Sequence, residues 1–284
     1  MAEEDVIISK RISSSWSRWP IFGVLVLVAL TIVYPLYFVI ISSFRPNADY
    51  LQDPFGLPGV WSLENYASLI NTYGVGQAFM NSMFVSITSV VCILILASLA
   101  GYALAKLPVP GKKQMTAIFV SVMLIPGPVL IIPIYLMLAR LGLVNTFAGL
   151  ILVYIATGLP FATFFLTLSF RGIPDEVIEA ARIDGAGFFR IMWSIIVPMG
   201  SSGLATLAVL QFLGAWNELI FAFIVVTDPS MRLLTPTLAS IGERFLTDQP
   251  LVSAGLFITA SIPLLLLLFA SKYIMQGLQV GVSR

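Results

Sequence analysis

A cluster of charged residues interrupts an otherwise apolar chain between positions 171 and 190. Its seven charges have both signs, and they are Arg171, Asp175, Glu176, Glu179, Arg182, Asp184 and Arg190. Mixed charges separated by alanine and glycine suit a surface that pairs with another protein better than they suit a reaction centre. The run Glu179-Ala-Ala-Arg-Ile-Asp-Gly-Ala186 lies within this cluster and is the first candidate functional segment.

Common catalytic and metal-binding chemistries lack their residues here. The chain has no histidine, and its one cysteine, Cys92, lies in an apolar run. Histidine metal sites, Ser-His-Asp triads and internal disulfides are therefore excluded. The phosphate-binding pattern Gly-x-x-x-x-Gly-Lys-Ser/Thr is also absent, so the chain does not hydrolyse ATP by that route. We predict no catalytic residue, no metal site and no nucleic-acid partner.

A second candidate site lies within the apolar segments themselves. Leu204, Gln211 and Glu218 share one helical stripe, because seven residues make nearly two turns. A carboxylate at mid-membrane costs about 2.5–3.5 kcal/mol on insertion scales. Glu218 is therefore expected to face a cavity or a partner, either in a solute path or in a fixed bond between helices. We also assign to a candidate substrate path Asn81, Gln211, Phe212, Trp216 and Asn217.

Packing is the competing interpretation for most of these polar and aromatic residues. Ser82, Ser86 and Ser89 form a stripe that is expected to face other helices and not lipid. Phe212 and Trp216, one turn apart, fit bundle packing as well as a flat surface for a sugar ring.

The composition predicts an all-α, polytopic membrane protein that holds these residues in place. Hydrophobic residues make up 58% of the chain and charged residues 10%, against roughly 25% charged residues in soluble domains. With about 20 apolar residues per crossing, six spans are predicted, at Ile21–Ile41, Ala78–Ala105, Met115–Ala139, Phe147–Phe170, Gly200–Val226 and Leu251–Ile274. Pro126, Pro128 and Pro133 are expected to kink the third span.

The distribution of basic residues predicts the orientation. With a cytoplasmic N-terminus, eleven of the fifteen lysines and arginines lie inside, and Arg45, Arg140, Arg232 and Arg244 lie outside. Residues 1–20, the 171–198 loop and both termini are then cytoplasmic. The polar 44–77 loop is extracytoplasmic, with a short surface helix near Trp61–Tyr66. We expect one transmembrane domain over 1–284, in the plasma membrane, with no cleaved signal peptide.

The charged insert is predicted to contain a short amphipathic helix. Pro174 fits the first helical turn, and Asp175 and Glu176 follow at the positive end of the helix dipole. Gly185 is suited to a left-handed residue that ends the helix. The spacing predicts that Val177, Ala180, Ala181 and Asp184 share one face.

The ordered run resembles the EAA loop of ABC-importer permeases. Glu179-Ala-Ala, Asp184-Gly-Ala186 and Ile196-Val-Pro198 carry this resemblance, just before the penultimate span. Asn81-Ser, Gly101-Tyr-Ala-Leu-Ala-Lys106, Trp216-Asn-Glu218 and Gln276-Gly-Leu278 are similar to the maltose-type carbohydrate branch, in its smaller six-span subunit. The ending Gly281-Val-Ser-Arg284 departs from that family's usual tail.

The resemblance implies a type I ABC importer permease-like bundle and a set of partners. These are a second permease, two ATP-binding subunits that carry ATP and Mg, and an extracytoplasmic sugar-binding protein. It also implies an ATPase-coupling role for Glu179, Ala180, Ala181, Asp184, Gly185 and Ala186. The implied cargo is a disaccharide or oligosaccharide, with monosaccharides, polyols and glycerol phosphate esters as competitors.

Two other classes of membrane protein compete with a permease. A secondary transporter or channel typically shows repeated broken helices and several membrane charges, whereas Glu218 is the single candidate here and no repeat is visible. A membrane-embedded enzyme lacks evident catalytic residues.

Overall fold

The computed structural model describes residues 15–244 and 248–279. Within these ranges the chain is helical and has no strand, which agrees with the predicted all-α class. Contacts divide the chain into two compact units. Of the described residues, 15–68 and 248–257 form unit 1, and 69–244 and 258–279 form unit 2.

Unit 1 contains a long apolar helix and a folded loop. It comprises α2 (Ser15–Ser43), α3 (Asn47–Gln52), most of α4 (Glu64–Asn71) and the start of α15 (Gln249–Gln279). The predicted loop helix begins at Glu64, three residues later than Trp61, and continues to Asn71. Arg45 is buried beneath this loop, where it pairs with Asp49 at 3.0 Å and donates to the carbonyl of Gly56.

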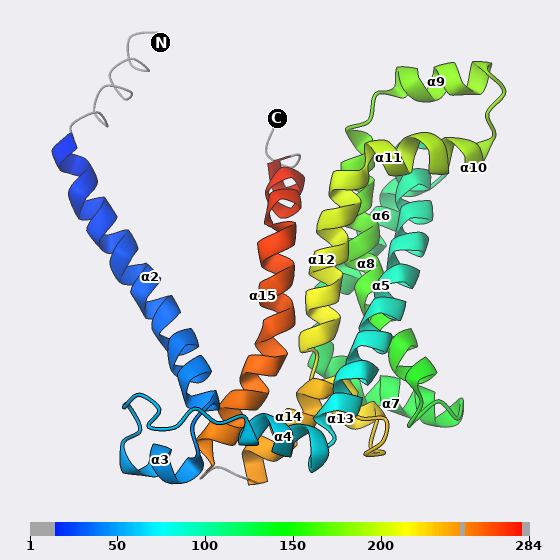
Figure 1. Cartoon of the computed structure of the whole chain (residues 1–284). Coiled ribbons are helices and arrows are strands. Elements are labelled where there is room, and N and C mark those ends of the chain that lie inside the picture. The colour runs from blue at the N-terminus through cyan, green and yellow to red at the C-terminus, as the bar shows by residue number, and fades with distance from the viewer. Residues whose placement is uncertain (1–14, 245–247, 280–284) are drawn as a thin grey trace. The chain divides into compact units, whose positions relative to one another are not determined.

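Unit 2 holds the remaining helices (Figure 1). They are α5 (Val75–Lys106), α6 (Lys112–Met123), η1 (Gly127–Leu130), α7 (Ile131–Arg140), α8 (Phe147–Arg171), α9 (Asp175–Ile183), α10 (Phe188–Ile191), the π-helical turn η2 (Met192–Ile196), α11 (Val197–Met199), α12 (Ser201–Asn217), α13 (Ile220–Val225), α14 (Leu234–Arg244) and the rest of α15. In this unit α9 lies at one end of the bundle, and α7 and α13 lie at the other.

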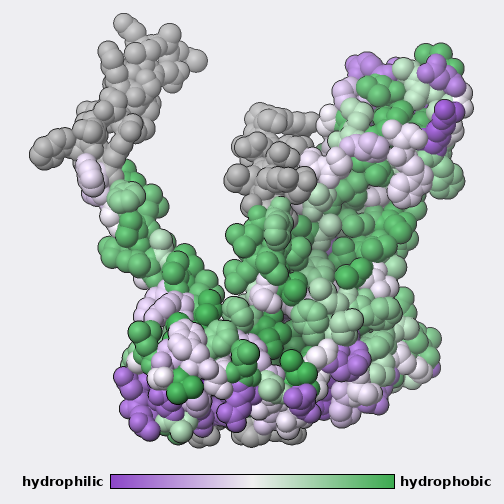
Figure 2. All heavy atoms as spheres, viewed as in Figure 1, coloured by the Kyte–Doolittle hydropathy of each residue, from purple (hydrophilic) through white to green (hydrophobic). Residues whose placement is uncertain are grey.

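Close packing of α5 against α8 and α12 forms the centre of unit 2. At Gly101 an added Cβ would lie 3.1 Å from the Cβ of Leu166 and 3.2 Å from the backbone nitrogen of Thr167. Only glycine allows the two helices to approach this closely without a shift. Over unit 2, hydrophobic residues cover the middle of the bundle, and hydrophilic residues gather at its two ends (Figure 2).

Four helices are long and apolar enough to cross a membrane, and two bent pairs raise the number to six if each pair is one span. The four are Trp19–Ser43, Val75–Lys106, Phe147–Arg171 and Gln249–Phe269. The third predicted span is broken by 92° between Met123 and Gly127, next to Pro126. The fifth starts at Ser201, after a 78° bend, and its helix stops at Asn217 before α13. The count of six therefore stays a prediction.

Candidate functional site at the α9 end of the bundle

The charged insert folds as the predicted short helix, α9, between α8 and α10. Pro174 has φ −60° and ψ 135°, so it precedes the helix as its N-cap and does not lie in its first turn. Asp175 and Glu176 open the helix, where their charges favour the positive dipole end.

The end of α9 is a Schellman motif. Gly185 has φ +79°, its N–H donates to the carbonyl of Arg182 at 3.0 Å, and the N–H of Ala186 donates to that of Ala181 at 2.9 Å. These two bonds satisfy carbonyls that would otherwise be unpaired at the helix end. The predicted left-handed role of Gly185 is confirmed.

The side of α9 that packs on the bundle is centred on a residue outside the shared face that the spacing predicted. Ile178 is the buried residue of the helix, at 3% exposure, and Ala181 packs beside it. Val177, Ala180 and Asp184 are exposed. The longer side chain of Ile178 reaches the apolar cluster, and it thereby sets which side of the helix turns inward.

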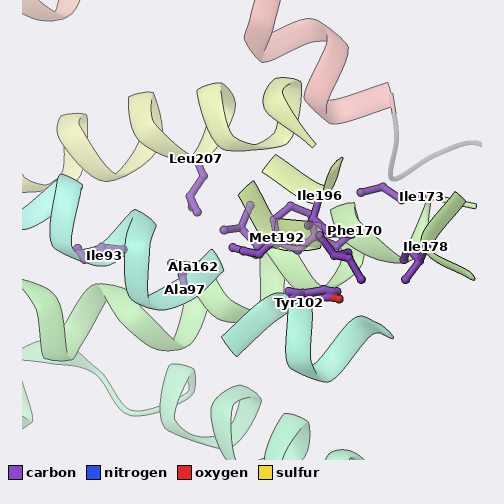
Figure 3. Packing of buried hydrophobic residues seen from close by; sticks show 12 residues of the cluster. Ile93, Ala97, Tyr102, Ala162, Phe170, Ile173, Ile178, Met192, Ile196 and Leu207 are labelled. Atoms are coloured by element: carbon purple, nitrogen blue, oxygen red, sulfur yellow. The ribbon is translucent and has the colours of Figure 1, made fainter. Parts of the chain in front are cut away.

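Ile178 belongs to a cluster that joins α9 to the ends of α5, α8 and η2. Tyr102, Phe170 and Met192 are buried in it, and Figure 3 shows them together near Ile196. Ala186 packs against the same cluster. The bundle thus provides a solid base for α9.

The outward side of α9 and the segment after it carry exposed apolar groups. Ile183 is 87% exposed, Phe189 is 66% exposed and Trp193 is 50% exposed. Glu179, Ala180, Asp184 and Gly185 are exposed as well. Of the six predicted coupling residues, these four face outward, whereas Ala181 and Ala186 face the bundle.

Sequence reasoning placed no role on Lys106 beyond the motif that contains it. Its side chain is 5% exposed, and its Nζ donates to Asp175 Oδ1 at 2.7 Å and to the carbonyls of Ile173 and Arg171. The hydrogen bond and charge of Lys106 lower the pKa of Asp175. A lowered carboxyl pKa stabilises the folded state above the unfolded pKa, and this contribution is lost as the pH falls through the lowered value.

Two of the candidate path residues, Asn81 and Trp216, are buried and bonded within the chain. Asn81 is buried and donates to the carbonyls of Ser230 and Arg232, both at 3.0 Å, so it anchors the loop before α14. Trp216 is 2% exposed, donates to the carbonyl of Thr259 at 3.1 Å and stacks on Phe212 at 5.7 Å. These contacts favour packing over a free surface for a sugar ring.

Glu218 bridges the break between α12 and α13. Its Oε1 accepts from the backbone nitrogen of Phe221 at 2.8 Å. Its Oε2 accepts from that of Ala222 at 2.9 Å and from the Tyr154 hydroxyl at 3.1 Å. The carboxylate therefore caps α13 and ties it to α8. Sequence reasoning missed Tyr154, because no spacing rule links it to a residue so distant in the chain.

Gln211 and Glu218 do meet at one cavity, as the shared stripe predicted. The cavity holds about 220 Å³ and is also lined by Tyr154, Thr157 and Gly158. Gln211 Nε2 donates to the carbonyl of Gly158 at 3.3 Å. Asn217 is exposed, and its amide donates to the carbonyl of Leu213 in its own helix.

One serine of the α5 stripe makes a hydrogen bond to another helix, and the other two are packed between helices. Ser82 Oγ accepts from the backbone nitrogen of Leu234 at 2.8 Å and so caps α14. Ser86 and Ser89 are completely buried, and within the described part of the chain their hydroxyls have no hydrogen-bond partner. Their small size, rather than a polar contact, explains their place between helices, as predicted.

These features define a polytopic helical membrane protein with an ordered, outward-facing helix at one end of its bundle. Residues 93–284 match the family described as the binding-protein-dependent transport system inner membrane component. The diacetylchitobiose uptake system permease of Streptomyces coelicolor is 34% identical over 80% of this chain and 75% of that protein. The arabinooligosaccharides transport system permease of Halalkalibacterium halodurans is 30% identical over 96% and 98%.

A solved structure has the same fold. The crystal structure of a bacterial ABC transporter involved in the import of the acidic polysaccharide alginate has a TM-score of 0.80 and 23% identity, and the match covers 92% of this chain and 98% of that chain. The chain belongs to the family of binding-protein-dependent transport system inner membrane components, as a permease subunit of an ABC importer. Its partners are a second permease, ATPase subunits and a binding protein.

Proposed function

We propose that this permease imports a carbohydrate and that α9 is the helix through which its ATPase subunits drive transport. In this proposal the chain has no catalytic site, and ATP and Mg are bound by the ATPase subunits. Both termini and the 171–198 loop face the cytoplasm, which agrees with the eleven basic residues on that side.

The observation that carries the coupling role is the outward side of α9. Ile183 is 87% exposed next to Glu179 and Ala180, on a helix that is closed at its end by Gly185 and seated on the bundle through Ile178. A large exposed apolar side chain beside a small residue and a charge suits a protein contact. A short helix with fixed ends also transmits a push better than a loop.

The proposed cargo is a disaccharide or oligosaccharide. Relatives whose names refer to diacetylchitobiose and arabinooligosaccharides support this class. Monosaccharides, polyols and glycerol phosphate esters are the competitors that the test below separates.

Gln211 is the residue of this chain that best fits a place on the solute path. It faces the cavity of about 220 Å³ and makes one bond of 3.3 Å to the carbonyl of Gly158. Glu218 lines the same cavity but accepts three hydrogen bonds, and Asn81 and Trp216 are buried and bonded to backbone carbonyls. Ligand pockets usually measure about 300–1,000 Å³. This chain therefore supplies a part of the path, and we propose that the second permease completes it.

The test of coupling is Ala180→Arg in the complex co-expressed with its partners. We expect the ATPase subunits to be lost on purification while the second permease is retained. A long charged side chain at position 180 blocks the contact between α9 and the ATPase subunit, and it does not touch the bundle. Normal recovery of the ATPase subunits with Ala180→Arg contradicts the docking role.

The test of the cargo uses the binding protein encoded with this chain. It is purified, and the ligand that it retains is identified by mass spectrometry. A ligand that is not a carbohydrate contradicts the sugar assignment.

A further inference from the structure

Lys106, at the end of α5, is bonded to three successive parts of the segment that leads into α9. Its Nζ donates to the carbonyl of Arg171 at 3.4 Å, to the carbonyl of Ile173, and to Asp175 Oδ1 at 2.7 Å. An ammonium group has three donors, and here each has an acceptor. With 5% exposure of its side chain, the charge is kept out of water by bonds that replace hydration.

The two carbonyls are ones that no helix satisfies. Arg171 ends α8, and Ile173 lies between α8 and α9. Carbonyls at a helix end have no partner within the helix. Lys106 supplies their donor from a different helix, so the exit of α8 and the entry of α9 are both fixed to α5.

A second contact from the same turn of α5 fixes α9 on its apolar side. Tyr102, four residues before Lys106, is 1% exposed and belongs to the cluster that buries Ile178. It also packs on Phe188 at 5.1 Å, just after α9. One contact would let α9 rotate about it. Two contacts from one helical turn, one apolar and one charged, set its direction.

We propose that Lys106 is the positioning residue that makes α5 and α9 move as one body when the ATPase subunits act on α9. This inference rests on the coupling role proposed above. Without the ammonium, α9 keeps its seat at Ile178 but tilts under load. Movement of the ATPase subunits is then absorbed at the α8–α9 junction and does not reach α5.

The experiment measures the distance between α5 and α9 in the assembled importer. In a Cys92→Ser background, spin labels are attached at Leu96→Cys on α5, 45% exposed, and at Arg182→Cys on α9. Arg182 is exposed and opens on the cleft that Lys106 and Glu179 also line. Distance distributions are recorded for the complex without nucleotide and with Mg-ATP plus vanadate.

We expect a narrow distribution that nucleotide does not change when Lys106 is present. With Lys106→Met the distribution is expected to broaden about twofold and to become nucleotide-dependent, since a segment with fewer tertiary contacts opens locally. Lys113→Met is the matched control. It removes the same charge from an exposed position nearby and should leave the distance unchanged. A merely structural role would lower the yield of complex without making the distance depend on nucleotide.

Three results overturn the inference. The first is a Lys106→Met distribution as narrow as that with Lys106, in a complex that still binds its ATPase subunits, and this result leaves the coupling role standing. The second applies if Lys106→Met fails to assemble. In that case the distance distribution is recorded with Asp175→Ala, which alters a side chain that is 72% exposed. An α5–α9 distance distribution unchanged by Asp175→Ala refutes the inference. The third is a complex with Lys106 intact that retains no ATPase at α9, which refutes the coupling role as well.

Discussion

At the scale of single residues, Glu218 shows how a costly membrane carboxylate can be explained by the chain's own backbone. Three donors surround it, namely the backbone nitrogens of Phe221 and Ala222 and the hydroxyl of Tyr154. Each carboxylate oxygen accepts from a backbone nitrogen at the start of α13, and Oε2 also accepts from α8. The geometry favours a capping and bridging role.

We therefore expect Glu218→Ala to lower stability by about 0.5–2 kcal/mol, the range found when a side chain that accepts from the first backbone nitrogens of a helix is removed. Tyr154→Phe, which removes one of the three donors, should cost less. Asn217→Ala serves as the neighbouring control, since its side chain is exposed. The measurement is the unfolding midpoint of the purified complex together with uptake per folded molecule. A large fall in uptake at unchanged stability would return Glu218 to the solute path.

At the scale of the element, the two glycines that follow α9 allow the effect of backbone strain to be measured alone, because both have room for a Cβ and only one has a positive φ. Gly185 has φ +79° and Gly187 has φ −76°, and an added Cβ would meet nothing within 4 Å at either position. Gly185→Ala should cost roughly 1 kcal/mol, because a left-handed residue with a Cβ is strained.

This cost corresponds to about a fivefold change in an equilibrium. We expect about fivefold less ATPase subunit to be recovered with the complex that carries Gly185→Ala. The complex that carries Gly187→Ala should retain the normal amount. Equal recovery with both variants would mean that the closed end of α9 does not matter for docking. Loss with both would point to the loop sequence and not to the backbone angle.

At the scale of the whole molecule, the orientation follows from charge and can be measured directly. In the Cys92→Ser background, Ile183→Cys on α9 should react with a membrane-impermeant maleimide only after intact cells are opened. Ser230→Cys, in the exposed loop before α14, should react in spheroplasts with an intact membrane. Labelling of Ile183→Cys from outside would reverse the topology and remove the basis for coupling.

The sequence alone determined the features that depend on local chemistry. Apolar runs of membrane length, the helix after Pro174 and the left-handed Gly185 follow from composition, capping and backbone sterics, which act between near neighbours. Motif order was enough to identify the family. The proline-rich third span was also expected to bend, although not its 92° break.

The tertiary structure alone decided what each polar side chain touches. Asn81, a candidate for the solute path, bonds to the loop at Ser230 and Arg232, and Lys106 bonds to the segment that enters α9. Ile178, which the spacing did not single out, turns α9 toward the bundle. Such partners lie tens of residues or more away in the chain. Their choice depends on how close whole helices approach, and no local periodicity encodes that distance.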